Sequence, residues 1–455
     1  MSGMKIHFIA IGGAVMHDLA ISLHKKGYSV TGSDDEIFEP SRSKLLSYGL
    51  LPDKFGWCPE RITSALDTII LGMHAKADNP ELIKAKELGL KIMSFPEYIF
   101  EQTKDKKRIV VAGSHGKTTT TAMIMHVLKS SGRRFDYMVG SSIDGYETMV
   151  SLSDDSEYAV LEGDEYLTSP VDSRPKFHLY HPDIAIINGI AWDHMNVFPT
   201  YENYFDQFRI FADTITHGGT LIYFEKDKEA ERIAGSIRKD IRVIPYKTHG
   251  YFINKRGFFA ATHNRVTELK IFGEHNMQNM SAAKEACMCA DISEDDFYDA
   301  LETFNGTSRR LQKIGENERG IVYLDFAHAP SKVKATVEAV AERYPSRTII
   351  ACLELHTFSS LNNNFLPQYR GTLDKATFPF VYFNPHAIEH KKLPPLSVQI
   401  VKEAFGDNRL QVFNDSGTLF KAIKETQSHN PVYLIMSSGD FNGIDFNVLS
   451  EELLK

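Results

Sequence analysis

Runs of apolar, β-branched residues alternate with helix-like segments along the first hundred residues of the chain. In the helix-like segments, apolar residues recur with a period near 3.6, which is typical of a helix with one buried face. Alternation of this kind predicts a parallel sheet with helices on its faces. The expected strands lie at 5–11, 28–32, 68–72 and 91–93, and the expected helices at 14–26 and 79–88.

The same alternation starts again after a charged linker at 102–108, and once more after a turn at 306–308. Between these points, a polar, hairpin-rich stretch at 246–269 precedes an alanine-rich helix at 276–290. Further strands are expected at 109–112, 158–161, 183–188, 321–324, 348–353, 380–383 and 432–436. We therefore predict three α/β domains, at 1–104, 105–307 and 308–455.

Composition and charge are those of an ordinary globular protein of 455 residues. Apolar residues make up 42% and charged residues 24% of the chain, which is enough for several cores and argues against general disorder. Acidic residues number 59 and basic residues 51, so the net charge of −8 opposes binding to nucleic acid. We expect no nucleic-acid partner.

The four cysteines are too few for a disulfide framework and lack the spacing of a metal-binding set, so we expect buried thiols. The first residues pass directly from an apolar run into a glycine turn and do not resemble a secretory signal. No apolar run approaches the ~18 residues that a membrane-spanning helix needs. The sequence therefore predicts a cytoplasmic protein with no membrane partner.

The strongest chemical signal is the segment Val111-Ala-Gly-Ser-His-Gly-Lys-Thr-Thr-Thr120, which lies between a predicted strand and a predicted helix. Backbone N–H groups of such a turn cradle phosphates, while the lysine reaches the β- and γ-phosphate oxygens and the threonine binds Mg²⁺. Val111 replaces the first glycine of the usual P-loop pattern, and the alternative is a glycine turn that only caps a helix. We predict a nucleotide site formed by Gly113, Ser114, His115, Gly116, Lys117, Thr118 and Thr119.

Acidic residues follow two other predicted strands at the points where those strands end. Glu162, Asp164 and Glu165 follow one strand, and Asp193 and His194 follow its neighbour. The carboxyl ends of parallel strands open onto the same edge of a sheet, where carboxylates can hold Mg²⁺ against nucleotide phosphates. Alone, each group would be an ordinary solvated loop; beside a P-loop, the two groups favour a magnesium site.

A second glycine turn, at Gly12 and Gly13, joins the first strand to the first helix, and Asp34 follows the second strand. Such a turn can place a diphosphate on a helix N-terminus while the carboxylate accepts a ribose hydroxyl. The turn does not match the G-x-G-x-x-G pattern, so it supports NAD only weakly. A nucleotide diphosphate site and a purely structural β–α junction both stay open.

Two further groups carry less information when taken alone. Asn276 and Asn279 lie on one face of a predicted helix, where amides can recognise adenine or serve as ordinary helix residues. Arg310 and Asp325 lie near the start of the predicted third domain. An arginine there is either a solvated surface residue or a clamp that meets a γ-phosphate when the domain closes.

In this order, the motifs resemble those of the Mur ligase family, the ATP-dependent amide ligases of peptidoglycan metabolism. The resemblance covers nearly the whole chain and runs through the first glycine turn, GSHGKTTT, EGDE, N-x-x-x-x-DH, HNMQN, RR and D-x-x-H-x-P. It implies a Rossmann-like UDP-binding domain, a central P-loop ATPase-like domain and a Rossmann-like C-terminal α/β domain. It also implies ATP and Mg²⁺ as cofactors and an acyl-phosphate intermediate. The substrates would be UDP-N-acetylmuramate and a short peptide or amino acid, bound by a monomer or homodimer.

The resemblance also assigns roles to individual positions. The catalytic residues would be Lys117, Glu162, His194 and Arg310. Thr118 would bind a first Mg²⁺, and Glu162 and His194 would bind a second Mg²⁺. ATP would also meet Asn276 and Asn279 at adenine, Asp325 at the ribose and Arg310 at the γ-phosphate. The UDP-sugar would bind Gly12, Gly13, Asp34 and His74.

The amine substrate is predicted from two segments, 162–177 and 437–444. Both resemble family members that attach the tripeptide L-Ala-γ-D-Glu-meso-diaminopimelate more than those that attach L-alanine. The residues expected to meet this substrate are Arg174, Lys176 and Phe441. At Ala329 and at 354–361 the sequence departs from the family pattern. These departures concern which amine is the substrate rather than the chemistry of the reaction. No lysine carbamate is expected, because Arg209 stands near its position.

Two other classes of function compete with a ligase. A regulatory or transport ATPase would turn over ATP without a UDP-sugar and would leave the first glycine turn unused. A nucleotide-sugar dehydrogenase or binding module would bind a nicotinamide and would leave the P-loop unexplained. Binding of ATP–Mg²⁺, UDP-N-acetylmuramate and NAD therefore separates the three classes.

Overall fold

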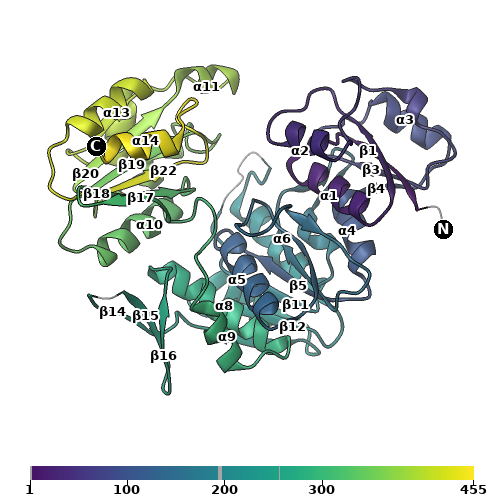
Figure 1. Cartoon of the computed structure of the whole chain (residues 1–455), viewed down its shortest axis with the longest axis horizontal. Coiled ribbons are helices and arrows are strands. Elements are labelled where there is room, and N and C mark those ends of the chain that lie inside the picture. Colours follow the sequence, from purple (N-terminus) through teal and green to yellow (C-terminus); the bar gives the residue numbers. More distant parts are fainter. Residues whose placement is uncertain (1–2, 193–196, 256) are drawn as a thin grey trace. The chain divides into compact units, whose positions relative to one another are not determined.

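The structure, a computed structural model, describes residues 3–192, 197–255 and 257–455, which form two compact units (Figure 1). The described part of the first unit comprises 3–192, 197–247 and 280–300. That of the second unit comprises 248–255, 257–279 and 301–455. Both units contain parallel sheets with flanking helices, while the three predicted domain boundaries stay a prediction. Among the described residues, no helix is long and apolar enough to cross a membrane.

The first sheet has four parallel strands in the order β2-β1-β3-β4. These strands are β1 (Lys5–Ile9), β2 (Ser29–Ser33), β3 (Thr68–Leu71) and β4 (Ile92–Ser94). The helices are α1 (Ala14–Lys25), α2 (Ser41–Ser47), α3 (Pro80–Glu87) and α4 (Phe95–Thr103), with a short 3₁₀ helix at Pro59–Arg61. Successive residues of β3 face opposite sides of the sheet. Ile70 therefore joins the apolar cluster that includes α1, while Ile69 and Leu71 join the cluster that includes α3.

The second sheet has seven strands in the order β13-β12-β11-β5-β8-β6-β7, with β7 antiparallel to β6 and the other pairs parallel. Its strands are β5 (Lys107–Ala112), β6 (Phe135–Met138), β7 (Val150–Ser151), β8 (Tyr158–Glu162), β11 (Ile184–Ile187), β12 (Thr220–Phe224) and β13 (Arg242–Tyr246). The helices that follow them are α5 (Lys117–Ser130), α6 (Tyr201–Asp213), α7 (Lys228–Ser236), α8 (Glu274–Cys289) and α9 (Glu294–Leu301). A hairpin, β9 (Leu167–Ser169) and β10 (Asp172–Pro175), and a 3₁₀ helix at Lys176–Leu179 follow β8. Because β5 lies between β8 and β11, residues after all three strands meet at one edge.

The second unit contains a three-stranded antiparallel sheet and a six-stranded sheet in the order β17-β18-β22-β19-β20-β21. The small sheet is β14 (Tyr251–Ile253), β15 (Phe258–Ala261) and β16 (Val266–Leu269). The larger one is β17 (Gln312–Asn317), β18 (Gly320–Asp325), β19 (Ile349–Leu355), β20 (Phe378–Phe383), β21 (Gln411–Phe413) and β22 (Val432–Met436). Its helices are α10 (Pro330–Arg343), α11 (Pro385–His390), α12 (Val398–Phe405), α13 (Ser416–Glu425) and α14 (Phe446–Leu453), with a 3₁₀ helix at Leu366–Tyr369.

Every strand that the apolar runs predict is present, whereas several shorter strands are not predicted. The strand β6 shows one reason, because Asp136 interrupts its apolar run and is nevertheless buried, where it pairs with Lys106. The expectation of buried cysteines is confirmed for Cys287 and Cys352. For Cys58 and Cys289 the expectation is wrong, since both are half-exposed.

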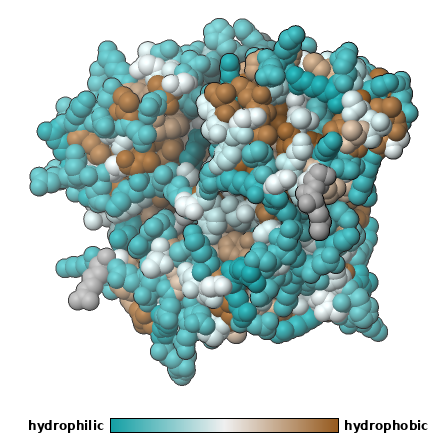
Figure 2. Space-filling model, turned by 45° about the vertical axis from the view of Figure 1, so that its right-hand side comes forward, coloured by the Kyte–Doolittle hydropathy of each residue, from teal (hydrophilic) through white to brown (hydrophobic). Residues whose placement is uncertain are grey.

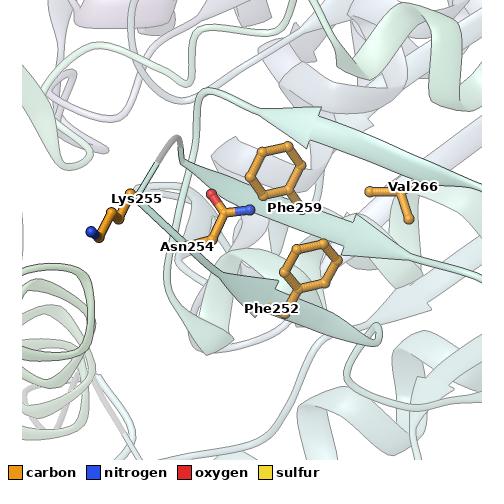
Figure 3. Close-up of a pocket in the computed structure, with 5 residues that line it drawn as sticks. All are labelled: Phe252, Asn254, Lys255, Phe259 and Val266. Carbon is orange, nitrogen blue, oxygen red and sulfur yellow. The ribbon is translucent and has the colours of Figure 1, made fainter.

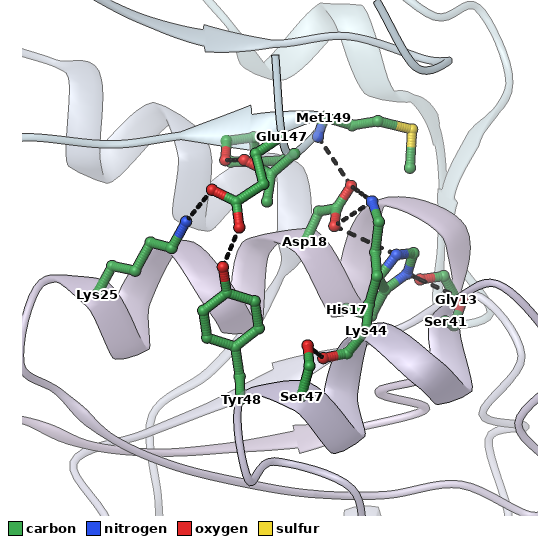
Figure 4. A network of polar contacts seen from close by, with 12 residues as sticks. Gly13, His17, Asp18, Lys25, Ser41, Lys44, Ser47, Tyr48, Glu147 and Met149 are labelled. Atoms are coloured by element: carbon green, nitrogen blue, oxygen red, sulfur yellow. Dashed lines mark hydrogen bonds and ion pairs between the residues drawn. The ribbon is translucent and has the colours of Figure 1, made fainter. Parts of the chain in front are cut away.

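A polar network ties α1 to the loop before β7 (Figure 4). The carboxylate of Asp18 is fully buried and accepts the backbone N–H of Met149 at 2.8 Å and the ammonium of Lys44 at 3.0 Å. The ring of His17 contacts the same carboxylate at 3.2 Å, and its Nδ1 lies 2.9 Å from the carbonyl oxygen of Gly13. A second, exposed pair joins Lys25 to Glu147. The buried part of this network therefore reaches from the Gly12–Gly13 turn to the second sheet.

The turn between β1 and α1 is held by Asp34. Its carboxylate accepts the backbone N–H of Gly12 at 2.7 Å. A Cβ at Gly12 would lie only 2.9 Å from that oxygen, so glycine is needed for this close approach. Burial is the main cause that raises the pKa of Asp34, to about 6.

Replacing Asp18 by alanine should destabilise the first unit by about 2–4 kcal/mol, because it leaves the Met149 N–H and the Lys44 ammonium without their buried partner. Thermal unfolding of the purified protein measures the change. The matched control is Glu147→Gln, which removes an exposed ion pair worth at most about 1 kcal/mol. Equal losses in the two variants would show that the buried contact contributes no more than the surface pair.

Replacing Asp34 by asparagine should raise thermal stability at pH 8 and change it little at pH 4. The pKa of Asp34 in the folded protein, about 6, lies above the ~3.9 expected for an unfolded chain, so folding favours the protonated form. The stability that this group contributes is complete below about pH 4 and is lost as the pH rises through 6. The expected gain at pH 8 is about 1–3 kcal/mol, with Glu36→Gln as an exposed control. A gain that is independent of pH would contradict the raised pKa.

Candidate active site

The predicted P-loop connects β5 to α5 as a tight turn. Gly113 and Gly116 have φ values of +127° and +74°, a region that favours glycine, and Gly116 directly precedes the first residue of α5. A Cβ at Gly113 would lie 2.9 Å from the backbone nitrogen of Asn188, which follows β11. The N-terminus of a 14-residue helix thus follows a loop whose backbone packs closely on the neighbouring strand. Backbone N–H groups in this arrangement form an anion site.

Lys117, the first residue of α5, is largely buried and paired within the protein. Its Nζ donates to Glu165 Oε2 at 2.7 Å and to the carbonyl oxygen of Gly113 at 2.8 Å. Burial alone would lower the pKa of Lys117, but the carboxylates around it, that of Glu165 foremost, raise the pKa overall. The P-loop lysine therefore carries a positive charge at neutral pH.

Thr118, the predicted ligand of a first Mg²⁺, contacts Glu162, a predicted ligand of a second Mg²⁺. The hydroxyl of Thr118 donates to Glu162 Oε1 at 2.9 Å, and the backbone N–H of Gly140 donates to the other carboxylate oxygen at 2.9 Å. The third predicted ligand, His194, lies outside the described residues. Within the described ranges, no group of three or more His, Cys, Asp or Glu side chains could hold a metal by itself. A hydroxyl and a carboxylate are nonetheless the hard oxygen donors that suit Mg²⁺ when phosphates complete its shell.

The remaining P-loop residues are held by neighbouring strand ends. Ser114 lies 2.8 Å from the hydroxyl of Tyr204 on α6 and accepts the N–H of Ala191 at 2.8 Å. The ring of His115 lies where a Cβ on Gly189 would stand, which explains a glycine there. Thr119 is buried in the first turn of α5.

At the first glycine turn, the predicted UDP-sugar residues share one sheet edge. Gly12 and Gly13 follow β1, and His74 is exposed in the turn after the adjacent parallel strand β3. Asp34 follows β2 on the other side of β1, where its carboxylate already holds Gly12. The four positions are therefore neighbours in the sheet, while contact with a UDP-sugar stays a prediction.

Four predicted nucleotide contacts belong to the second unit, in which each has a partner or a defined environment. Asn276 is buried and donates to the carbonyl oxygen of Phe272 at 2.8 Å, and Asn279 is buried one turn later. The carboxylate of Asp325 is buried at the end of β18 and accepts the N–H groups of Leu311 at 2.6 Å and Ala327 at 2.7 Å. Burial raises the pKa of Asp325. Arg310 is half-buried, with its guanidinium 4.9 Å from the ring centre of Phe326.

The predicted amine-contacting residues differ in exposure. The side chain of Arg174 is 56% exposed and forms a two-pronged pair with Asp172, with its closest contact at 2.7 Å. Lys176 pairs with Asp164 at 2.6 Å. Phe441 is fully buried and stacks 5.7 Å from Tyr382, so it supports the loop after β22 from inside the core. Substrate contact by these three residues stays a prediction.

The contacts of three residues near the P-loop escaped prediction. Glu165 was predicted only as one of three carboxylates near a magnesium site, and its direct contact with Lys117 was not predicted. Tyr204, a buried residue of a helical segment, carries no motif that could reveal it. Asn188 donates to Thr120 and accepts from Tyr246, and only its position at a strand end hinted at this role.

A hollow lies on the small antiparallel sheet of the second unit (Figure 3). It encloses about 420 Å³ and is lined by Phe252, Asn254, Lys255, Phe259 and Val266, none of which is a predicted site residue. Phe252 and Phe259 stack with their centres 5.2 Å apart, while Lys255 points away from them. On the face of the molecule shown in Figure 2, hydrophilic residues separate the apolar patches. The titratable groups of the candidate site lie elsewhere.

Comparison with known proteins gives a consistent result. Three family models match successive parts of the chain: "Mur ligase family, catalytic domain" at 5–107, "Mur ligase middle domain" at 111–287 and "Mur ligase, glutamate ligase domain" at 309–439. A UDP-N-acetylmuramate–L-alanine ligase of Streptococcus mutans is 30% identical, over 96% of this chain and 93% of its own. A UDP-N-acetylmuramate–L-alanyl-γ-D-glutamyl-meso-2,6-diaminoheptandioate ligase of Haemophilus influenzae is 28% identical over 99% of both chains.

Solved structures agree with the predicted three-domain α/β architecture. A UDP-N-acetylmuramate–alanine ligase from Thermotoga maritima superposes with a TM-score of 0.71, covering 99% of this chain and 98% of that one at 21% identity. The fold class that the strand pattern and motifs predict is therefore confirmed. Sequence motifs, fold and whole-length relatives together establish that the chain belongs to the Mur ligase family.

Proposed function

We propose that this protein is an ADP-forming ligase that joins the lactyl carboxylate of UDP-N-acetylmuramate to an amine. The observation that carries the proposal is the cluster of Lys117 and Thr118, which begin α5 after the phosphate loop, with Glu162 at the end of β8. A charged lysine, a hydroxyl and a carboxylate at one helix N-terminus suit a nucleotide triphosphate with its cation. Relatives that use UDP-N-acetylmuramate match over the whole chain.

The proposed reaction activates a poor electrophile. Resonance makes a carboxylate unreactive toward amines, so transfer of the γ-phosphoryl group of ATP to it supplies a leaving group. The amine then attacks the acyl phosphate, and the tetrahedral intermediate collapses to the amide with release of phosphate. Such chemistry depends on positioning and on neutralising phosphate charge rather than on a protein nucleophile.

The residues of the P-loop supply most of this neutralisation. Lys117 would move from Glu165 to the β- and γ-phosphate oxygens, where its ammonium offsets their charge. Thr118 would hold a first Mg²⁺, and Glu162 and His194 would hold a second. Bound Mg²⁺ supplies further charge neutralisation. In the second unit, Asn276 and Asn279 would contact adenine, Asp325 the ribose and Arg310 the γ-phosphate. Gly12, Gly13, Asp34 and His74 would hold the UDP-sugar.

For the amine substrate we favour the tripeptide L-Ala-γ-D-Glu-meso-diaminopimelate. Its several carboxylates need cations, and the exposed guanidinium of Arg174 lies on the hairpin that follows the strand of Glu162. A guanidinium–carboxylate contact of this kind contributes roughly 1.5–3 kcal/mol. L-Alanine is the second candidate, because the relative from Streptococcus mutans is named for it. In either case the protein would act in peptidoglycan metabolism in the cytoplasm, as a monomer or homodimer.

Replacing Lys117 by alanine should abolish phosphate release while the fold survives, because the phosphate loses its positive partner and the loop geometry rests on glycines and backbone contacts. The assay contains ATP–Mg²⁺, UDP-N-acetylmuramate and an amine, and circular dichroism checks the fold. Wild-type-like release by the variant would refute the P-loop assignment, and release without UDP-N-acetylmuramate would favour a regulatory ATPase.

The amine preference can be tested with the same phosphate assay, by comparing the tripeptide with L-alanine. We expect the tripeptide to be preferred, and Arg174→Ala to lower its kcat/KM by at least about tenfold, or ~1.4 kcal/mol. Arg209→Ala, an exposed arginine on α6 that pairs with Asp206, serves as the control. Preference for L-alanine would overturn the tripeptide proposal and leave the ligase mechanism standing.

A further inference from the structure

Glu165 makes a contact that the ligase mechanism does not use. Its side chain is 1% exposed, and one carboxylate oxygen accepts the Lys117 ammonium at 2.7 Å. The other oxygen accepts from the hydroxyl of Tyr204 at 3.2 Å. The Lys117 ammonium, which is proposed to bind the phosphates of ATP, is therefore bound to a protein carboxylate in this structure.

The hydrogen bonds that reach Glu165 have a defined direction. The N–H of Ala191 donates to the Ser114 oxygen at 2.8 Å, and since the Tyr204 hydroxyl donates its single hydrogen to Glu165, Ser114 is the donor to Tyr204 at 2.8 Å. Each bond in this chain places its hydrogen toward the carboxylate, which favours the ionised form of Glu165. The chain also connects Glu165 to Ser114, a residue of the P-loop itself.

Lys117 cannot serve Glu165 and a triphosphate in full at the same time. Its ammonium has three N–H donors, and two of them are taken by Glu165 and by the Gly113 carbonyl. Contact with both a β- and a γ-phosphate needs two donors, so binding of a triphosphate competes with the bond to the Gly113 carbonyl and with the buried pair with Glu165. The free energy of that pair is subtracted from the free energy of nucleotide binding.

We infer that Glu165 is a positioning residue that holds Lys117 in the nucleotide-free protein and competes with the nucleotide's phosphates for it. Glu165 thereby holds the buried lysine in place, and it limits how tightly ATP and ADP are held. The inference rests on the proposed function, because it takes the P-loop to be the nucleotide site.

The test compares binding of Mg²⁺ with a non-hydrolysable ATP analogue and with ADP, by isothermal titration calorimetry on the full chain. Glu165→Gln keeps the size of the side chain and an acceptor for Tyr204 but removes its charge. We expect Kd values at least about tenfold lower than those of the wild type, or ~1.4 kcal/mol. Glu165→Asp keeps the charge but is shorter by one methylene group, so its Kd should lie between those of the wild type and of Glu165→Gln.

The charge-matched control is Asp164→Asn. Asp164 neighbours Glu165 in the chain but pairs with Lys176, so its replacement removes one negative charge near the P-loop without freeing Lys117. A general electrostatic effect would tighten nucleotide binding equally in Asp164→Asn and Glu165→Gln. Only loss of the specific pair predicts a larger effect in Glu165→Gln.

Labelling of Lys117 gives a second readout that a purely structural role of Glu165 would not change. An amine-directed reagent must reach Nζ, and the pair with Glu165 holds this nitrogen in a side chain that is only 16% exposed. Without Glu165, Lys117 should therefore react faster in the nucleotide-free protein, as followed by peptide mass spectrometry. Equal affinities in Glu165→Gln and Asp164→Asn, with unchanged labelling, would overturn the inference. A wild-type protein that binds no nucleotide would instead overturn the proposed function itself.

Discussion

Charge balance around one buried ammonium constrains the centre of this protein. Lys117 is largely enclosed where α5 begins, and a charge in such a place needs carboxylates close by. Parallel strands provide them, because the ends of β5 and β8 meet at one edge and bring Glu162 and Glu165 to the loop. The neighbouring positions of β5 and β8 in the second sheet therefore place a carboxylate beside Lys117 Nζ. Moving β8 away from β5 would leave the Lys117 ammonium without its carboxylate partner.

The predicted ligand-binding groups share a second property, which is that many already have partners within the chain. Asp34 holds the N–H of Gly12, Asn276 holds the carbonyl of Phe272, and Asp325 holds the N–H of Leu311. Such groups pay little extra desolvation when a ligand arrives, because they exchange or extend hydrogen bonds that they already make. They also keep the loops in shape without a ligand. One side chain can therefore serve both the fold and a substrate.

Local patterns explain how far the sequence could predict this arrangement. The P-loop, Glu162 and the central strands could be predicted because a few residues next to one another in the chain mark them, such as Gly113 and Gly116, whose positive φ values favour glycine. Tyr204 could not be predicted, since it meets Ser114 from 90 residues further along the chain and nothing in its own helix marks it. The burial of Phe441 was hidden for a similar reason, because its neighbours Tyr382 and Phe420 come from other elements. Contacts between distant segments depend on topology, which no short motif records.

The bond between Asp18 and Met149 also has a consequence for synthesis of the chain. The two residues are 131 positions apart in the sequence. Ser22, on the same helix, accepts the N–H of Leu152, which lies 130 positions further along. The whole first sheet leaves the ribosome before Met149 and Leu152 do. N-terminal parts of a chain generally fold first. Until Met149 has emerged, the Asp18 carboxylate on α1 lacks the backbone N–H that it accepts in the folded protein. The first sheet can therefore reach its final packing only after the β6–β7 region has emerged.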